Sequence, residues 1–137
     1  MAVTQGPTLQ FKLDMLNGVH QPGDTYKIAL YNASSANLNK NTTTYSTTGE
    51  VAGVGYTAGG KELAGRTVAL SGDIAYLDFD DPVWPSATIT ADSASIYNAS
   101  RSNKVLGSFT FTVGSSTNGN FTVQMPTPGS SAAIRIP

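Results

Sequence analysis

The chain has 137 residues, with 8 basic and 9 acidic side chains, one histidine and no cysteine. Its net charge of −1 excludes the basic surface of a nucleic-acid-binding protein, and the lack of cysteine excludes a disulfide scaffold, a thiolate zinc site and a cysteine nucleophile. Charged residues make up 12% of the chain, about half the usual share, so we expect part of the surface to lie against other subunits.

The N-terminal segment contains no recognisable export signal. Residues 1–7 have neither a basic nor an apolar stretch, both of which a secretory signal requires. No apolar run approaches the roughly 20 residues that span a bilayer. We therefore expect a soluble protein that is made in the cytoplasm and has no membrane partner.

The first predicted element is a short helix near the N-terminus. Leu9, Leu13 and Leu16 lie on one helical face, and Gly18 follows as a C-terminal stop. The same stretch also alternates between apolar and polar residues, so a strand leading into a helical turn remains an alternative.

Every other predicted element is a β-strand, because apolar residues recur at every second position. In chain order these strands are Tyr26–Tyr31, Arg66–Leu70, Asp73–Phe79, Ala87–Tyr97, Val105–Val113, Phe121–Met125 and Ile134–Ile136. The alternation changes phase within Ala87–Tyr97, which predicts a β-bulge. Asn118 and Gly119 favour a turn that joins the strands Val105–Val113 and Phe121–Met125 in a hairpin.

These short strands, separated by turn residues, predict an all-β fold. We expect an antiparallel β-sandwich or jelly-roll-like barrel with at most one short helix, formed by a single domain over residues 1–137. The stretches Ala33–Thr48 and Met125–Ala133 are interpreted as long connections or contact arms. The terminal segments 1–22 and 126–137 are also candidate contact arms.

A glycine-rich segment, Gly55-Tyr56-Thr57-Ala58-Gly59-Gly60-Lys61, resembles the first part of a phosphate-binding loop. Glu62 follows where such a loop has the hydroxyl that binds magnesium, and the flanking sequence predicts strands rather than a helix. The favoured interpretation is a tight glycine turn.

Candidate catalytic or metal-binding side chains are few. Asp78, Asp80 and Asp81 could bind calcium or share a proton, but an EF-hand pattern is missing, so a solvated turn is favoured. His20 is the only histidine, and any catalytic dyad or triad would need it. Next to Pro22 it is more typical of a hydrogen-bonded turn residue. We therefore predict no catalytic residue, cofactor or metal, and no enzyme.

Trp84 is the most informative aromatic residue. Pro82 and Pro85 force an extended segment without a central position in a sheet. The indole could seal the core, anchor a subunit contact or stack on a sugar. Asn-X-Ser/Thr sequons are only weak evidence for glycosylation in a chain so rich in Ser and Thr; they begin at Asn32, Asn41, Asn98 and Asn120.

Five motifs follow one another along the chain: Asp24–Tyr31 (DTYKIALY), Tyr45–Val51 (YSTTGEV), Gly55–Gly60 (GYTAGG), Asp81–Ala91 (DPVWPSATITA) and Ile96–Asn98 (IYN). In this order they resemble small structural proteins of tailed bacteriophages, over roughly residues 9–137. The resemblance implies a virion protein, since several such proteins decorate or cement the capsid, and it implies no catalytic motif. Asp92 stands where the resemblance would place a basic residue.

The resemblance and the composition together predict a capsid decoration or cement protein on the capsid surface of the virion. Its expected partners are the major capsid protein, whose lattice it would bind to stabilise the DNA-filled head, and other copies of itself in a dimer or trimer. Exposed strand edges could add strands to a neighbour. The alternatives are a tail, collar or fibre component that binds a host surface glycan, and a hydrolase that uses His20 or the cluster Asp78–Asp81. The candidate interface or structural residues are Gly55, Tyr56, Gly59, Gly60, Trp84, Tyr97 and Asn98.

Overall fold

A computed structural model describes residues 6–36, 38–125 and 134–136 of the chain. Its elements in chain order are β1 (Gly6–Pro7), α1 (Leu9–Leu16), β2 (Tyr26–Tyr31), β3 (Lys61–Glu62), β4 (Thr67–Ser71), β5 (Ile74–Asp78), β6 (Val83–Ala87), β7 (Thr90–Asn98), β8 (Lys104–Ser115), β9 (Gly119–Thr122) and β10 (Ile134–Ile136). Within the described residues, no helix has the length and apolar composition that crossing a membrane requires.

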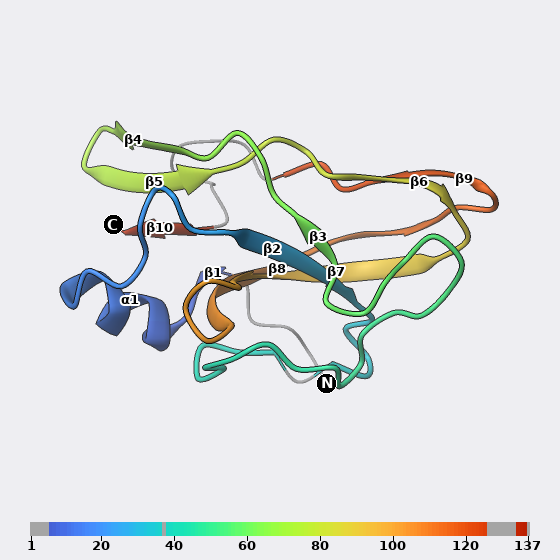
Figure 1. The fold of residues 1–137 in the computed structure, drawn as a ribbon, viewed down its shortest axis with the longest axis horizontal. Helices are drawn as coiled ribbons and strands as arrows, with labels where there is room; N and C mark the ends of the chain where they lie inside the picture. The colour runs from blue at the N-terminus through green and yellow to red at the C-terminus, as the bar shows by residue number, and fades with distance from the viewer. Residues whose placement is uncertain (1–5, 37, 126–133, 137) are drawn as a thin grey trace.

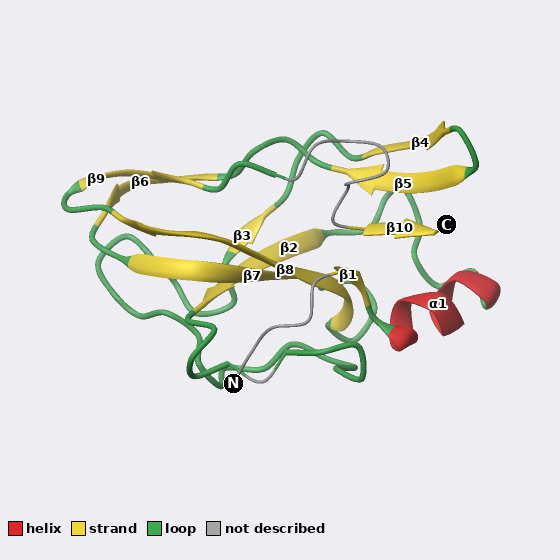
Figure 2. Ribbon diagram, turned by 180° about the vertical axis from the view of Figure 1, so that it is seen from behind, coloured by secondary structure: helices red, strands yellow, loops and turns green. Residues whose placement is uncertain are grey.

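The strands form two layers, and all pairings between the described strands are antiparallel (Figure 1). One layer is a five-stranded sheet with the order β1-β8-β7-β2-β3. The other combines a three-stranded sheet, β10-β5-β4, with a two-stranded sheet, β6-β9. Helix α1 lies at the end of the molecule where β4, β5 and β10 also lie (Figure 2). The fold is therefore all-β and sandwich-like with one short helix near the N-terminus, as the sequence predicts.

The main core lies between the two layers. Alternation along the strands turns every second side chain inward, and the large buried side chains of this cluster include Ile28, Ile96, Leu106, Phe109, Trp84 and Phe121. Each is at most 5% exposed, so both layers contribute to one continuous core.

A second, smaller cluster lies on the other face of the five-stranded sheet. Ala36 and Leu38, in the connection after β2, are buried with Tyr31, Tyr97 and Val105. The middle strands of this sheet are consequently buried on both faces. The stretch Ala33–Thr48, predicted from the sequence as a long connection or contact arm, is a connection whose buried residues help to cover the sheet.

Several predicted elements are confirmed. The structure has the expected helix, which Thr8 caps at its start, so the alternative of a strand there is wrong. The strands β2 and β10 have the predicted bounds, and the pairing of β7 with β8 shifts register between Ala91 and Ser93, which is the expected bulge.

Two predictions about connectivity are wrong. The strands β8 and β9 do not form a hairpin, because β8 pairs with β7 and β1 while β9 pairs with β6 in the other layer. Asn118, with φ of 47°, lies in the turn where the chain crosses between the layers. The predicted strand Ala87–Tyr97 is also divided: its first residue ends β6, and β7 begins at Thr90.

The structure covers only part of the two terminal segments. In segment 1–22, β1 pairs with β8, and α1 follows it. In segment 126–137, β10 pairs with β5. Residues 1–5, 37, 126–133 and 137 are outside the described residues, and so is nearly all of the predicted connection Met125–Ala133.

Candidate functional site

The start of α1 is fixed to the five-stranded sheet by Thr8. Its hydroxyl oxygen accepts a hydrogen bond from the N–H of Phe11 (3.1 Å) and donates to the carbonyl of Val105 in β8 (2.9 Å). Its backbone N–H donates to the carbonyl of Leu106 (2.9 Å). A threonine at this position satisfies a free N–H of the first helical turn, and here it also determines where the helix sits.

The helix is oriented with its leucines outward. Phe11 and Asp14 are its buried residues. Leu9, Leu13 and Leu16 are 47%, 55% and 90% exposed, and at 100° per residue they share the opposite face. We call these three residues the leucine face. A surface helix of a globular protein ordinarily turns its apolar stripe toward the core, so this exposure is unusual.

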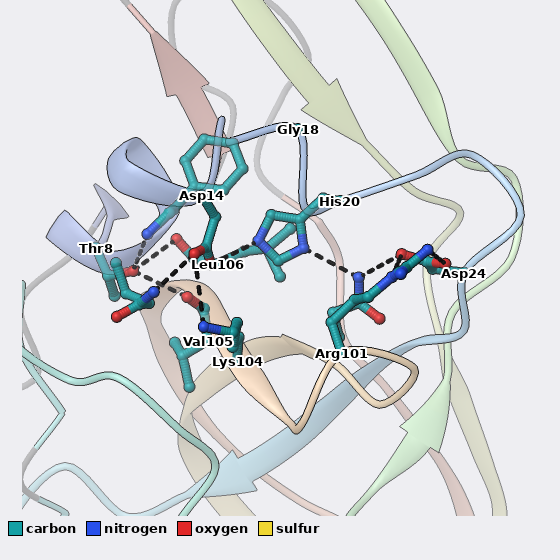
Figure 3. A network of polar contacts seen from close by, with 12 residues as sticks. Thr8, Asp14, Gly18, His20, Asp24, Arg101, Lys104, Val105 and Leu106 are labelled. Carbon is teal, nitrogen blue, oxygen red and sulfur yellow. Dashed lines mark hydrogen bonds and ion pairs between the residues drawn. The ribbon is translucent and has the colours of Figure 1, made fainter. Parts of the chain in front are cut away.

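A network of polar contacts beneath α1 explains this orientation (Figure 3). The carboxylate of Asp14, whose side chain is 2% exposed, accepts hydrogen bonds from Gln10 Nε2 (2.7 Å) and from His20 Nε2 (3.1 Å). Lys104 Nζ lies 3.8 Å from Asp14 Oδ1. A buried carboxylate needs such partners. Gln10 belongs to α1 itself, but His20 and Lys104 lie beneath the helix, so Asp14 faces inward and the leucines face solvent.

The hydrogen bonds of Asn98 determine the tautomer of His20. Asn98 Oδ1 accepts from the N–H of Ser100 (3.0 Å), and Nδ2 donates to Asp24 Oδ2 (2.9 Å), which assigns the amide oxygen and nitrogen. The second contact of Nδ2 is with His20 Nδ1 (3.0 Å), so Nδ1 accepts this hydrogen bond. Nε2 therefore carries the proton and donates a hydrogen bond to Asp14. Burial lowers the pKa of His20, with Asp14 opposing this effect. The imidazole is neutral and engaged at both nitrogens.

The network ends at the surface in an ion pair. Arg101 Nε and Nη2 donate to the two oxygens of Asp24 at 2.9 and 3.0 Å. These bonds hold the pKa of Asp24 well below its usual range. A forked pair of this kind has a defined geometry, so the loop between α1 and β2 is held to the turn between β7 and β8.

Next to α1 is an apolar groove of about 100 Å³, bordered by the helix and the three-stranded sheet. Its apolar lining includes Phe11, Met15, Val68, Leu77 and Ile134. Met15 and Val68 are 46% and 59% exposed. Together with the leucine face, this groove makes the α1 end of the molecule an apolar surface, which is a mark of an interaction site.

The structure brings Tyr56, Gly59 and Tyr97 together around the carboxylate of Glu50. The hydroxyls of Tyr45 and Tyr56 donate to Glu50 at 2.5 and 2.6 Å, and the N–H of Gly59 donates to it at 2.9 Å. The hydroxyl of Tyr97 donates to the carbonyl of Gly59. These residues form an internal network that fixes the connection between β2 and β3.

Gly55 and Gly60 belong to the tight turns of the same connection. Both have positive φ, 84° and 83°, and a Cβ on Gly60 would stand 1.8 Å from the carbonyl oxygen of Ile28. The segment therefore approaches β2 so closely that only glycine fits. This is the tight glycine turn that the sequence favours over a phosphate-binding loop.

Trp84 and Asn98 are both buried in the isolated chain. The indole is 4% exposed and contacts the rings of Tyr56 and Phe121, so of the three interpretations of Trp84 the core position describes its place in this structure. Asn98 is fully buried with its amide hydrogen-bonded, and its sequon is not accessible in the folded chain.

The acidic cluster has no metal-binding geometry. Asp80 and Asp81 are exposed, and Asp81 Oδ1 accepts a hydrogen bond from the N–H of Met125 (2.8 Å). Across the part of the chain that the structure describes, no three His, Cys, Asp or Glu side chains come together in a way that could hold a metal ion. Burial raises the pKa of Asp78.

The role of Asp14 and the outward orientation of the leucine face were not predicted from the sequence. The available signal was Asp14 itself, because it lies four residues after Gln10 and on the side of the helix opposite the leucines. The chain matches no family model, no curated protein and no solved structure. Its candidate site is therefore the apolar α1 end that the geometry defines.

Proposed function

We propose that this protein is a structural component of a tailed-bacteriophage virion, a capsid decoration or cement protein that binds the major capsid protein lattice and stabilises the DNA-filled head. The observation that carries the proposal is the leucine face, a helix surface held outward by the buried Asp14 network. The motif order that resembles phage structural proteins and the low charge of the chain support the same function.

The chemistry of the leucine face suits attachment to a repeated surface. Covering three leucine side chains that are about half exposed or more contributes on the order of 1 kcal/mol each. This free energy gives only weak binding at a single site. A shell offers the same site many times, however, and linked copies bind far more tightly than single ones. The rigid support beneath α1 keeps the loss of conformational entropy on binding small.

The test uses particles of the encoding virus that lack this protein, to which purified protein is added. Wild-type protein is expected to bind the shell and to restore its resistance to heat and osmotic shock. Leu16→Lys is expected to weaken binding at least about tenfold, because it places a charge in the apolar contact. Val113→Lys is the matched control, since Val113 is 63% exposed but lies in β8 outside the leucine face, and it should bind like wild type.

Copy number distinguishes this function from the alternative of a tail, collar or fibre part. A shell protein is expected in on the order of hundreds of copies per particle. A tail part is expected in far fewer copies, because the tail has low symmetry. Low copy number, or wild-type protein that does not bind shells, would contradict the proposal. The glycan-binding alternative has less support in the structure than in the sequence, because Trp84 is not available to stack on a sugar.

A further inference from the structure

Strand β4 is an exposed edge without the usual protection against pairing. Among the described strands it pairs only with β5, and both views show no other described element beyond it (Figures 1 and 2). Charged side chains and proline are the features that proteins use to block edge pairing. The sequence of β4, Thr67-Val68-Ala69-Leu70-Ser71, contains neither. Val68 and Leu70 are 59% and 75% exposed.

The other edge strands are protected or offer no apolar contact. The strands β1, β3, β6 and β10 contain Pro7, the pair Lys61 and Glu62, Pro85 and Arg135, respectively. In β9 the exposed side chains are the polar Asn120 and Thr122. Among the described strands that lie at the end of a sheet, β4 therefore differs from the rest.

The turn after β4 determines which of its backbone groups are free. Ser71 and Ile74 are paired across the two-residue turn Gly72-Asp73, and the residues that flank such a turn form a hydrogen-bonded pair. Hydrogen-bonded and non-hydrogen-bonded pairs alternate along antiparallel strands. The pair of Ala69 with Tyr76 is thus hydrogen-bonded, and the N–H and C=O groups of Val68 and Leu70 point away from β5.

The sequence of β4 is complementary to itself when read in the opposite direction. With Ala69 on a two-fold axis, Val68 of one copy stands opposite Leu70 of the other, and Thr67 stands opposite Ser71. In this register the outward N–H and C=O groups of Val68 and Leu70 pair with those of the second copy. Apolar side chains face apolar ones, and hydroxyls face hydroxyls.

The flanking charges favour the same antiparallel direction. Arg66 precedes β4 and Asp73 follows it. An antiparallel arrangement brings the Arg66 end of one strand beside the Asp73 end of the other, whereas a parallel arrangement would place like charges together.

We propose that two copies of this chain form a symmetric dimer through antiparallel pairing of their β4 strands, with the two-fold axis at Ala69. The two three-stranded sheets become one continuous sheet across the axis. The strands pair through backbone hydrogen bonds and the contact of Val68 with Leu70 of the second copy. This proposal is independent of any shell, since it concerns the isolated protein.

Sedimentation equilibrium of the full chain tests the dimer. Wild type is expected to be dimeric at micromolar concentration, and Leu70→Pro to associate at least tenfold more weakly. Proline removes an N–H that β5 does not use, so it is compatible with an edge strand, and circular dichroism checks that the fold is kept. Leu16→Lys, at an exposed leucine outside β4, should leave the dimer unchanged.

A cysteine at the axis tests the register. The chain has no cysteine of its own, so Ala69→Cys introduces a single thiol. At a non-hydrogen-bonded pair the two Cα atoms stand about 4.5 Å apart, which is within the range for a disulfide. Mild oxidation should yield a reducible covalent dimer from Ala69→Cys and much less from Thr67→Cys, whose partner would be Ser71.

Each outcome decides the proposal. A wild-type protein that is monomeric at the highest measurable concentration would overturn it. It would also be overturned by a dimer that persists unchanged in Leu70→Pro, or by equal crosslinking of the two cysteine variants. Failure of shell binding would leave these measurements unaffected, because they contain no shell.

Discussion

Two buried or partly buried carboxylates hold segments of the chain against the five-stranded sheet, and their partners differ in chemistry. Asp14, beneath α1, is bound by His20 and Gln10 and has Lys104 nearby. One of these partners is a histidine, which changes its charge near neutral pH.

Glu50 lies in the connection between β2 and β3, and within the described part of the chain its carboxylate accepts hydrogen bonds only from neutral groups. They are the hydroxyls of Tyr45 and Tyr56 and the N–H of Gly59. The pKa values of both tyrosines are raised above the usual range. Burial is the largest cause, and the hydrogen bond to Glu50 is the second. The comparison indicates that only the network beneath α1 contains a partner, His20, that can take up a proton near neutral pH.

The largest expected effect comes from the turn next to the Glu50 network. Gly60→Ala forces a Cβ against the carbonyl of Ile28 at a φ of 83°, so the connection must move away from β2. We expect a loss of about 3 kcal/mol or more in the free energy of unfolding, measured by urea denaturation.

Gly72→Ala is the matched control for this substitution. Gly72 also has a positive φ, 59°, but a Cβ there would meet nothing within 4 Å. Its cost is expected to be about 1 kcal/mol from backbone strain alone. Equal losses for the two variants would show that the close approach at Gly60 does not matter.

A smaller and more local effect is expected from Asp14→Asn. The amide cannot accept as the carboxylate does from both Gln10 and His20, which costs about 2 kcal/mol, and α1 should open more often. Hydrogen exchange of the α1 amides should become about tenfold faster or more.

The corresponding change in the other network is Glu50→Gln. Faster exchange should then be confined to the connection around residues 45–60, with α1 protected as in wild type. If Glu50→Gln also released α1, the two networks would act as one unit and the contrast between them would be lost.

The smallest effect is a dependence of stability on pH near neutrality. The pKa of His20 in the folded chain lies below its ordinary value of 6.5, so below pH 6.5 the unfolded state takes up a proton that the folded state resists. The free energy of unfolding should therefore fall as the pH decreases from 6.5, by at most about 1.4 kcal/mol per pH unit.

His20→Gln should remove this slope, and Glu50→Gln should retain it. The charged groups that act on His20 are Asp14, Asp24 and Lys104. Because the pKa of Asp24 lies well below its usual range, its own contribution is lost only at far more acidic pH. A slope that persists in His20→Gln would mean that another group titrates in this window.

Local patterns were sufficient to predict the short helix and most of the longer strands, but not β1, β3 or most of β6, and the predicted strand Phe121–Met125 overlaps β9 in only two residues. The alternation of Tyr26–Tyr31 fixes β2, and the end of α1 follows from Gly18, whose φ of 65° suits a glycine after a helix. The all-β class follows from the number and shortness of the alternating segments. These features depend on residues close together in the chain.

Features that depend on distant residues were not predictable in this way. A turn at Asn118-Gly119 predicts a hairpin locally, but β9 pairs with β6 in the other layer, and that partner lies more than 30 residues earlier in the chain. The periodicity of Leu9, Leu13 and Leu16 identifies a face of the helix but does not say which way it points. That direction is set by Asp14 with His20 and Lys104, and Lys104 is far along the chain.

The cap of α1 has a consequence for the timing of folding. The hydroxyl of Thr8 donates a hydrogen bond to the carbonyl of Val105, 97 positions later in the sequence. The helix therefore cannot be attached to the sheet until β8 has been synthesised. An isolated helix of eight residues is unstable in water, and contacts between such distant residues form late. The leucine face is therefore assembled only after most of the chain has been made, and incomplete chains cannot present it to a partner.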